Sequence, residues 1–216
     1  MGFNKTLQTA HAGCMNTPMD SLEAVKVALE YDVDIIEVDV RFTENLTPVL
    51  SHNVIKKQND SEYVTLEEVV KLVSENEKVC INLDMKEYHG FRGIDDIVKK
   101  YNMGHRVFFT GIEFENVEKV NKSETEIPYF INYDFELSKI TDKEYLSEIR
   151  DRVCKANALG INLDYNFVSK ELIDVFHEVN KLVSVWTVDD YNKIKLFSHM
   201  GVDSITSRNI ANKINM

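Results

Sequence analysis

The sequence predicts a (β/α)8 barrel. Eight short β-rich runs alternate with amphipathic helical stretches along the 216 residues, which is typical of parallel strands covered by helices. An open doubly wound sheet is the alternative, but no Gly-x-Gly-x-x-Gly turn follows the first strand. The predicted strands are Leu7 to His11, Asp34 to Val40, Val79 to Met85, Val107 to Thr110, Tyr129 to Ile131, Gly160 to Asp164, Leu182 to Val188 and Val202 to Thr206.

Helical signals fill the segments between these strands. From residue 66 onward, apolar residues recur at positions i, i+3, i+4 and i+7, and Thr65 with Glu68 fits a capping box at the start of that helix. Ser169 is the predicted N-cap of a later helix with the same periodicity. Glycines follow several predicted helices, and we expect them to end those helices in the left-handed conformation. They are Gly104, Gly160 and Gly201.

One segment interrupts the alternation after the second strand. Between Asp39 and the apolar run Pro48 to Leu50 there is no room for a helix, and residues 43–47 have the composition of a turn. A strand that returns through so short a connection must be antiparallel. This hairpin is therefore expected to bring His52 back beside Asp39.

Glu37 and Asp39 are the most informative residues of the second strand. Side chains two apart in a strand point to the same face, so the two carboxylates converge while the intervening apolar residues pack on the opposite face. Buried carboxylates need a positive partner. A divalent metal ion is one such partner, and a salt bridge at the rim of the barrel is the alternative.

Polar residues on the third strand extend this pattern. Asn82, Asp84 and Lys86 share one face by the same period of two, and active sites of such barrels gather at the carboxyl ends of the strands. Three carboxylates, without a thiolate or a cluster of imidazoles, favour Mg²⁺ or Ca²⁺ over zinc. Lys86 either stabilises charge on a phosphoryl oxygen together with the ion or only neutralises Asp84.

Two histidines flank these carboxylates in the predicted topology. His11 follows the first strand and His52 lies on the hairpin, and imidazoles titrate near neutral pH, which suits proton transfer. Each of them has the alternative of a structural, hydrogen-bonded role. Trp186, near the end of the seventh strand, either walls the pocket or fills the barrel. Cys14 is interpreted as a buried thiol and not as a nucleophile.

Composition limits the classes of function. The chain is expected to form one domain over residues 1–216, because no linker divides it. A net charge of -11 and scattered basic residues argue against nucleic-acid binding, and no apolar run reaches the roughly 20 residues of a membrane span. Three cysteines without paired spacing predict a reducing, cytoplasmic location. The composition leaves the oligomeric state open.

The motifs resemble those of the glycerophosphodiester phosphodiesterases. The resemblance runs through most of the chain in a fixed order, so the set is more specific than any one motif. The matching segments are His11-Ala12-Gly13, Asn16 to Ser21, Glu37 to Val40, His52, Asn82 to Lys86, Val185 to Val188 and Gly201 to Asp203.

This resemblance implies a barrel enzyme that hydrolyses small-molecule glycerophosphodiesters to glycerol 3-phosphate and an alcohol. It implies a divalent ion, Mg²⁺ or Ca²⁺, as cofactor and a cyclic phosphate intermediate. The implied roles are metal ligand for Glu37, Asp39 and Asp84, acid-base catalyst for His11 and His52, and phosphate contact for Lys86.

The chain also departs from the family pattern. Ala12 replaces an arginine that helps to hold the phosphate, Met19 replaces a carboxylate, and Asp84 is one methylene shorter than the usual glutamate. Arg41, on the same face as Asp39, is a candidate for the missing cation. A weak or inactive relative that binds metal or a phosphate ligand is the alternative function. Only residues 53–64 separate the hairpin histidine from the next helix, so we expect no sizeable capping insertion and a more open mouth.

Overall fold

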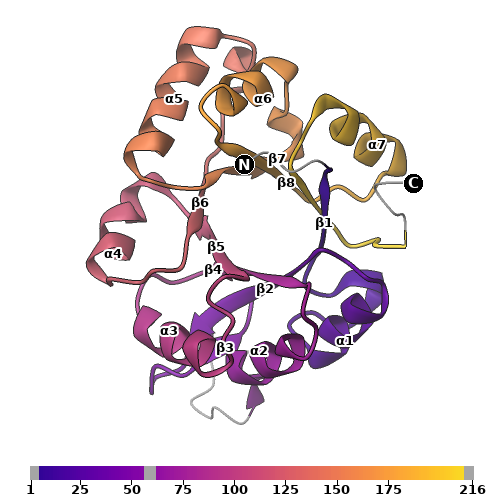
Figure 1. Cartoon of the computed structure of the whole chain (residues 1–216), viewed down its shortest axis with the longest axis vertical. Coiled ribbons are helices and arrows are strands. Elements are labelled where there is room, and N and C mark those ends of the chain that lie inside the picture. The colour runs from indigo at the N-terminus through magenta and orange to yellow at the C-terminus, as the bar shows by residue number, and fades with distance from the viewer. Residues whose placement is uncertain (1–4, 56–61, 212–216) are drawn as a thin grey trace.

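A closed barrel of parallel strands forms the centre of the molecule (Figure 1). The computed structural model describes residues 5–55 and 62–211, and in this part of the chain nine strands form one sheet. Eight of them close the barrel, because β1 pairs in parallel with both β9 and β2. The strands are β1 Leu7–Ala10, β2 Ile35–Phe42, β3 Pro48–Leu50, β4 Cys80–Met85, β5 Val107–Ile112, β6 Tyr129–Asn132, β7 Gly160–Asp164, β8 Leu182–Trp186 and β9 Ser204–Ser207.

Helices cover the outside of this barrel, one between successive barrel strands. This arrangement confirms the predicted (β/α)8 barrel, and the predicted strands differ from the observed ones mainly at their ends. For example, β2 continues to Phe42, whereas β8 already ends at Trp186. The α-helices of the described residues are α1 Leu22–Glu30, α2 Leu66–Ser74, α3 Phe91–Lys100, α4 Val117–Lys122, α5 Lys143–Lys155, α6 Lys170–His177 and α7 Tyr191–Met200.

The extra strand β3 forms the predicted hairpin with β2. The two strands are antiparallel, and Val40 lies opposite Leu50 in their register. Because α2 begins at Leu66, residues 51–65 are all that separate the hairpin from the next helix. The expectation of a hairpin without a sizeable capping insertion is therefore confirmed.

The alternation of side chains along β2 divides the core into two layers. Ile36, Val38 and Val40 are almost completely buried and belong to the hydrophobic core. Glu37 and Asp39 project from the opposite face of the strand and line the cavity at the end of the barrel. The two-residue period of the strand thus places an apolar layer behind a polar one.

The predicted helix starts are observed. Thr65 caps α2 by accepting a hydrogen bond from the backbone N–H of Glu68, and the Glu68 carboxylate accepts one from the backbone N–H of Thr65. Ser169 caps α6 through the backbone N–H of Leu172. The apolar face of α2 is fully buried, so capping and packing specify the same helix.

Two of the three predicted glycine caps are wrong. Gly201 ends α7 with a φ of 97°, as predicted, but Gly104 and Gly160 are not in the left-handed region. Asn102 and Asn157 lie nearer to their helix ends and take positive φ instead. Gly160 instead allows two strands to approach closely, because a Cβ there would lie 1.9 Å from the carbonyl oxygen of Leu182 on the neighbouring strand.

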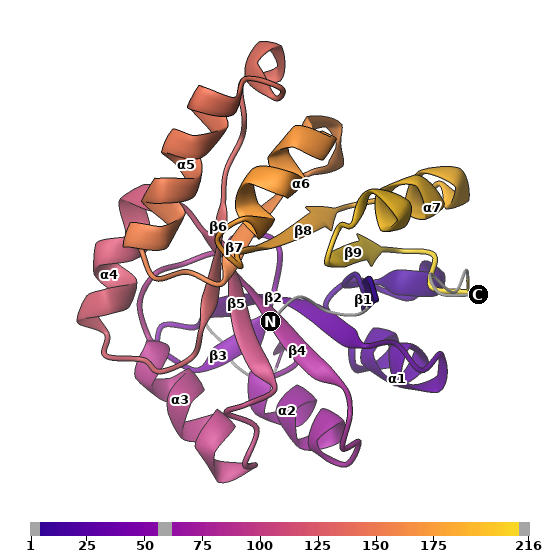
Figure 2. The ribbon, with the colours of Figure 1, turned by 45° about the horizontal axis from the view of Figure 1, so that its top comes forward.

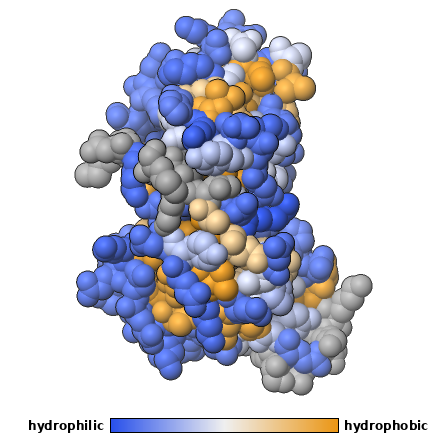
Figure 3. Space-filling view, turned by 90° about the vertical axis from the view of Figure 1, so that its right-hand side faces the viewer, coloured by the Kyte–Doolittle hydropathy of each residue, from blue (hydrophilic) through white to orange (hydrophobic). Residues whose placement is uncertain are grey.

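Among residues 5–55 and 62–211, no helix covers the side of the barrel between α7 and α1 (Figures 1 and 2). Figure 3 shows this side, where hydrophobic residues form separate patches within a mainly hydrophilic surface. None of the helices within the described ranges combines the length and the hydropathy that a membrane crossing would require.

Candidate active site

A cavity of about 500 Å³ opens at the carboxyl ends of the barrel strands. Each of the eight barrel strands, or the residue that directly follows it, contributes at least one side chain to its lining, and most of these are polar. The contributing residues include His11, Glu37, Asp39, Arg41, Asn82, Asp84, Lys86, Thr110, Asn132, Asn162, Trp186, Thr206 and Arg208, joined by His52 from the hairpin.

The three predicted carboxylates meet in this cavity. In the parallel pairing of β2 with β4, Glu37 lies beside Asn82 and Asp39 lies beside Asp84. One ligand atom from each of the three carboxylates lies within 4.8 Å of the others. Glu37, Asp39 and Asp84 could therefore bind a single metal ion, and oxygen donors of this kind suit a hard divalent cation.

Burial makes the negatively charged forms of these carboxylates less favourable. Glu37 is 7% exposed, and burial, followed by the nearby charges of Asp39 and Asp84, raises its pKa well above the usual range. Burial likewise raises the pKa of Asp84, although Lys86 opposes this effect. Glu37 accepts one hydrogen bond, at 2.9 Å, from the backbone N–H of Ala12. Its negative charge has no cationic side chain in direct contact among the described residues.

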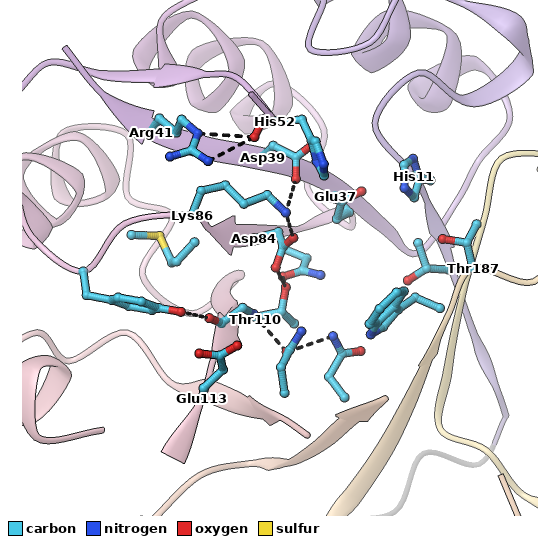
Figure 4. Close-up of a pocket in the computed structure, with 18 of the residues that line it drawn as sticks. His11, Glu37, Asp39, Arg41, His52, Asp84, Lys86, Thr110, Glu113 and Thr187 are labelled. Atoms are coloured by element: carbon cyan, nitrogen blue, oxygen red, sulfur yellow. Dashed lines mark hydrogen bonds and ion pairs between the residues drawn. The ribbon is translucent and has the colours of Figure 1, made fainter. Parts of the chain in front are cut away.

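Lys86 lies between the other two carboxylates (Figure 4). Its Nζ atom is 2.8 Å from Oδ1 of Asp39 and also contacts Oδ2 of Asp84. Burial alone would lower the pKa of Lys86, but the two carboxylates outweigh it and the pKa is raised. When all are charged, three carboxylates and one ammonium group leave two negative charges, which a divalent ion would neutralise.

The hairpin brings His52 to Asp39 as predicted. The backbone N–H of Ser51 donates to the carbonyl oxygen of Asp39 at 3.1 Å, and Nδ1 of His52 lies 3.2 Å from the Asp39 Oδ2 atom. A second contact comes from the loop before α1, where the Oδ2 atom of Asp20 accepts the backbone N–H of His52 at 2.9 Å. His52 is thus fixed through both its main chain and its ring.

His11 reaches the cavity from the end of β1. Its backbone N–H donates to the carbonyl oxygen of Ser207 at 3.0 Å, and its ring Nδ1 lies 2.6 Å from the carbonyl oxygen of Ala12. Both His11 and His52 line the cavity, and in Figure 4 they lie at the same edge of it as Glu37. Two imidazoles and three carboxylates therefore share one cavity.

The remaining predicted site residues, Arg41 and Trp186, also line the cavity. All three guanidinium nitrogens of Arg41 are engaged: Nε and Nη2 donate to the carbonyl oxygen of His52, each at 3.2 Å, and Nη1 donates to Glu87 at 2.9 Å. The indole Nε1 of Trp186 is buried and has no hydrogen-bond partner among the described residues.

Sequence reasoning missed the residues that the later strands contribute. Most of the predicted candidates come from the first three strands, whereas four other strands contribute hydroxyl and amide groups through Thr110, Asn132, Asn162 and Thr206. Thr110, for example, places Oγ1 3.0 Å from Oδ1 of Asp84. The same strand-end rule, applied to every strand, would have found them.

Cys14 agrees with the interpretation as a buried thiol. It is 1% exposed, and burial raises the pKa of its thiol to about 11, so the nucleophilic thiolate is disfavoured at neutral pH. Its Sγ atom donates to the carbonyl oxygen of Ala24. The thiol therefore packs behind the His11 loop and does not line the cavity described above.

Comparison with known proteins identifies the family. A model of the glycerophosphoryl diester phosphodiesterase family matches residues 53–211, which is more than half of the chain. The chain belongs to this family. The match contains Asp84, Lys86 and Trp186 but begins just after His52. Membership confirms the enzyme class predicted from the motifs, a phosphoric diester hydrolase.

Solved structures of glycerophosphodiester phosphodiesterases share the fold over nearly the whole chain. A protein from Galdieria sulphuraria assigned to these enzymes is 18% identical with a TM-score of 0.83, covering 96% of this chain and 95% of its own. A phosphodiesterase from Oleispira antarctica, solved with the product sn-glycerol-3-phosphate, is 16% identical with a TM-score of 0.80, covering 96% and 94%. The Thermotoga maritima enzyme is 20% identical with a TM-score of 0.76, covering 95% and 96%. No curated protein sequence matches the chain.

Proposed function

We propose that this family member hydrolyses glycerophosphodiesters to glycerol 3-phosphate and an alcohol in a reaction that depends on a divalent ion, Mg²⁺ or Ca²⁺. The observation that carries the proposal is the convergence of three carboxylates, with ligand atoms within 4.8 Å, in a cavity that two histidines also line. Family membership supports the reaction class, and the Oleispira antarctica relative was solved with sn-glycerol-3-phosphate.

Glu37, Asp39 and Asp84 are the proposed ligands of the ion. The ion would withdraw charge from a phosphoryl oxygen of the substrate and so favour attack at phosphorus. The donor set fits this assignment, because among the described residues no cationic side chain is in direct contact with the buried Glu37, and the cluster with Lys86 carries two negative charges when ionised. Lys86 is the proposed second contact to the phosphate, placed beside the ligands by its position after β4.

The two histidines are the proposed acid-base pair, and we infer from their hydrogen bonds which nitrogen each would use. Nδ1 of His52 faces a carboxylate oxygen of Asp39, and Nδ1 of His11 faces the carbonyl oxygen of Ala12. Because both partners only accept hydrogen bonds, each Nδ1 carries a proton. The Nε2 atoms are thus left to accept a proton from one substrate oxygen and to donate one to another.

The proposed reaction has two steps. A glycerol hydroxyl loses its proton to one histidine and attacks phosphorus, the bond from phosphorus to the alcohol oxygen breaks, and the other histidine protonates the leaving alcohol. Water then opens the resulting cyclic phosphate, and the two histidines exchange their roles. The amide and hydroxyl groups of Asn132, Asn162 and Thr206 line the same cavity and offer hydrogen bonds to a polar substrate.

In this proposal the whole chain acts as one barrel domain in the cytoplasm. Cys14, Cys80 and Cys154 are free thiols, which is typical of proteins from reducing compartments. Substrates are small phosphodiesters, and because only residues 51–65 lie between the hairpin and α2, we expect alcohols larger than ethanolamine to be accepted as well.

Release of glycerol 3-phosphate tests the proposal. Purified protein is incubated with glycerophosphocholine or glycerophosphoethanolamine in the presence of Mg²⁺ or Ca²⁺, with and without a chelator. We expect product only where free metal is present, and Glu37→Gln as the matched variant should lose it. Product formation that survives chelation would refute the metal dependence, and no product from either diester or from bulkier glycerophosphodiesters would refute the hydrolysis.

A further inference from the structure

Three cationic side chains line the cavity within the described residues, and two of them are already committed. Arg41 uses all three of its guanidinium nitrogens on the protein itself, and its side chain is 14% exposed. Lys86 is held between two of the three carboxylates. The third cation, Arg208, differs from both in its exposure and in its hydrogen bonding.

Arg208 retains unused donors. Its Nη1 atom lies 3.2 Å from Oδ2 of Asp189, and its side chain is 59% exposed. A guanidinium group has five N–H donors, so one contact through Nη1 leaves Nε and Nη2 available. Among the described residues, no other ion pair or hydrogen bond engages these two nitrogens. Of the three cationic side chains, Arg208 is therefore the one that can bind an anionic ligand and still keep its contact with Asp189.

The backbone of Arg208 is tied to the loop that carries His11. Arg208 directly follows β9, which lies beside β1 (Figure 2). The carbonyl oxygen of the preceding residue, Ser207, accepts a hydrogen bond from the backbone N–H of His11 at 3.0 Å. The carbonyl oxygen of Arg208 accepts a hydrogen bond from the backbone N–H of Met15 at 2.8 Å. On the other side, the backbone N–H of Arg208 donates to Asp189 at 2.7 Å. Its main chain is thus anchored on the His11 side of the cavity.

The loop that carries His11, residues 11–21, contains no lysine or arginine and so supplies no positive side chain to this side of the cavity. Ala12 follows His11 in the sequence, is 4% exposed, does not line the cavity and carries no charge. A phosphodiester bound between the carboxylate cluster and His11 would present an anionic oxygen to this side. A guanidinium fork matches such an oxygen in both charge and geometry.

We propose that Arg208 is a substrate-binding residue that donates hydrogen bonds to a phosphate oxygen on the His11 side of the cavity. Asp189 acts as a positioning residue, because it holds both the backbone N–H and the Nη1 atom of Arg208. The inference rests on the proposed function, since it adds a contact to the same phosphate. In this inference Arg208, directly after β9, supplies the positive charge that Ala12 does not.

The test compares Arg208→Ala and Arg208→Lys with Arg92→Ala, which removes an exposed arginine on α3 that does not line the cavity. Hydrolysis of glycerophosphocholine is measured with saturating Mg²⁺ or Ca²⁺, together with inhibition by inorganic phosphate. For Arg208→Ala we expect a rise in KM and in the inhibition constant of phosphate of about tenfold to a hundredfold, the range for a hydrogen bond to a charged group. kcat should change less, because such a contact holds substrate and transition state alike.

The outcomes separate this inference from the proposed function. Arg208→Lys should recover part of the loss, since it keeps the charge but not the fork, and Arg92→Ala should match the wild type. KM and inhibition constants within about twofold of wild type in Arg208→Ala would overturn the inference and leave Arg208 as the structural partner of Asp189.

If the wild type shows no hydrolysis, the proposed function fails, and calorimetric titration with inorganic phosphate in the presence of metal decides about Arg208. Binding by the wild type that weakens about tenfold or more in Arg208→Ala supports the contact. Equal binding by both proteins, or none by the wild type, overturns it.

Discussion

The buried carboxylate of Glu37 accepts the backbone N–H of Ala12 at 2.9 Å, which joins β2 to the loop that carries His11. Among the described residues it is the only hydrogen bond to this carboxylate, and it offsets little of the cost of burying a group that is 7% exposed and lies beside two other carboxylates. The site is therefore built at a cost in stability when no ion is bound. This arrangement and the residues around it lead to five testable predictions.

Replacing Glu37 with glutamine should stabilise the metal-free protein and remove its response to metal. The amide keeps an acceptor for Ala12 but carries no charge, so repulsion with Asp39 and Asp84 is relieved. A gain of about 1 kcal/mol would raise Tm by roughly 2–4 °C for a chain of this size. Thermal unfolding in chelator should show this gain, and Mg²⁺ or Ca²⁺ should raise Tm in the wild type only. A lower Tm of the variant in chelator would contradict the electrostatic argument.

The same residue predicts how the stability of the metal-free protein depends on pH. The pKa of Glu37 is raised in the folded state above its ordinary value of 4.5, so between these two values the folded state binds more protons than the unfolded state. The free energy of unfolding should therefore fall as pH rises through this window. Denaturant unfolding of wild type and Glu37→Gln in chelator, from weakly acidic to neutral pH, measures this effect. The difference between the two proteins should widen with pH, and a constant difference would exclude the titration of Glu37 as its source.

His11→Ala and His52→Ala should each lower kcat by at least about a hundredfold, the low end for general acid-base catalysis. Both rings line the cavity with Nε2 as the nitrogen left for proton transfer. Steady-state kinetics with glycerophosphocholine measure the loss, and His199→Ala on α7 is the control because that exposed ring bonds to its own helix. Near-normal turnover in either cavity variant would remove that histidine from the mechanism.

Lys86→Met should separate metal binding from substrate binding. The ammonium group now occupies the space between Asp39 and Asp84, so its removal should strengthen metal binding, by about tenfold if roughly 1.4 kcal/mol of repulsion is relieved. At saturating metal, kcat/KM should nevertheless fall, because the contact to the phosphate is lost. Calorimetric titration with Mg²⁺ and Ca²⁺ gives the affinity. Weaker metal binding in this variant would show that Lys86 organises the ligands and does not compete with the ion.

Asp20 should act on catalysis through the position of His52. Its Oδ2 atom accepts the backbone N–H of His52, whereas Asn at this position retains an oxygen acceptor and Ala does not. We expect Asp20→Ala to lower kcat by about tenfold, since a small misplacement of a catalytic group has large kinetic effects. Asp20→Asn should stay close to wild type. Equal losses in both variants would point to the charge of Asp20 and not to its hydrogen bond.

Much of the fold could be predicted because its signals are local. The period of two along β2 placed Glu37 and Asp39 on one face, and the capping box at Thr65 marked the start of α2. The prediction of a helix cap at Gly160 was wrong because this glycine is needed for close contact with Leu182 on another strand, and the local sequence does not reveal that contact. Local backbone geometry depends on residues that are close in the sequence, whereas a contact between two strands depends on their register.

The sequence by itself determined the barrel, the hairpin and the identity of the three carboxylates and two histidines that meet in the cavity. Only the tertiary structure decided their partners: Asp39 beside Asp84 in register, Asp20 on the main chain of His52, and Arg208 at the end of β9 beside the His11 loop. Residues that are adjacent only after the barrel closes are brought together by the strand order, and the side-chain periodicity of a single strand carries no information about that order.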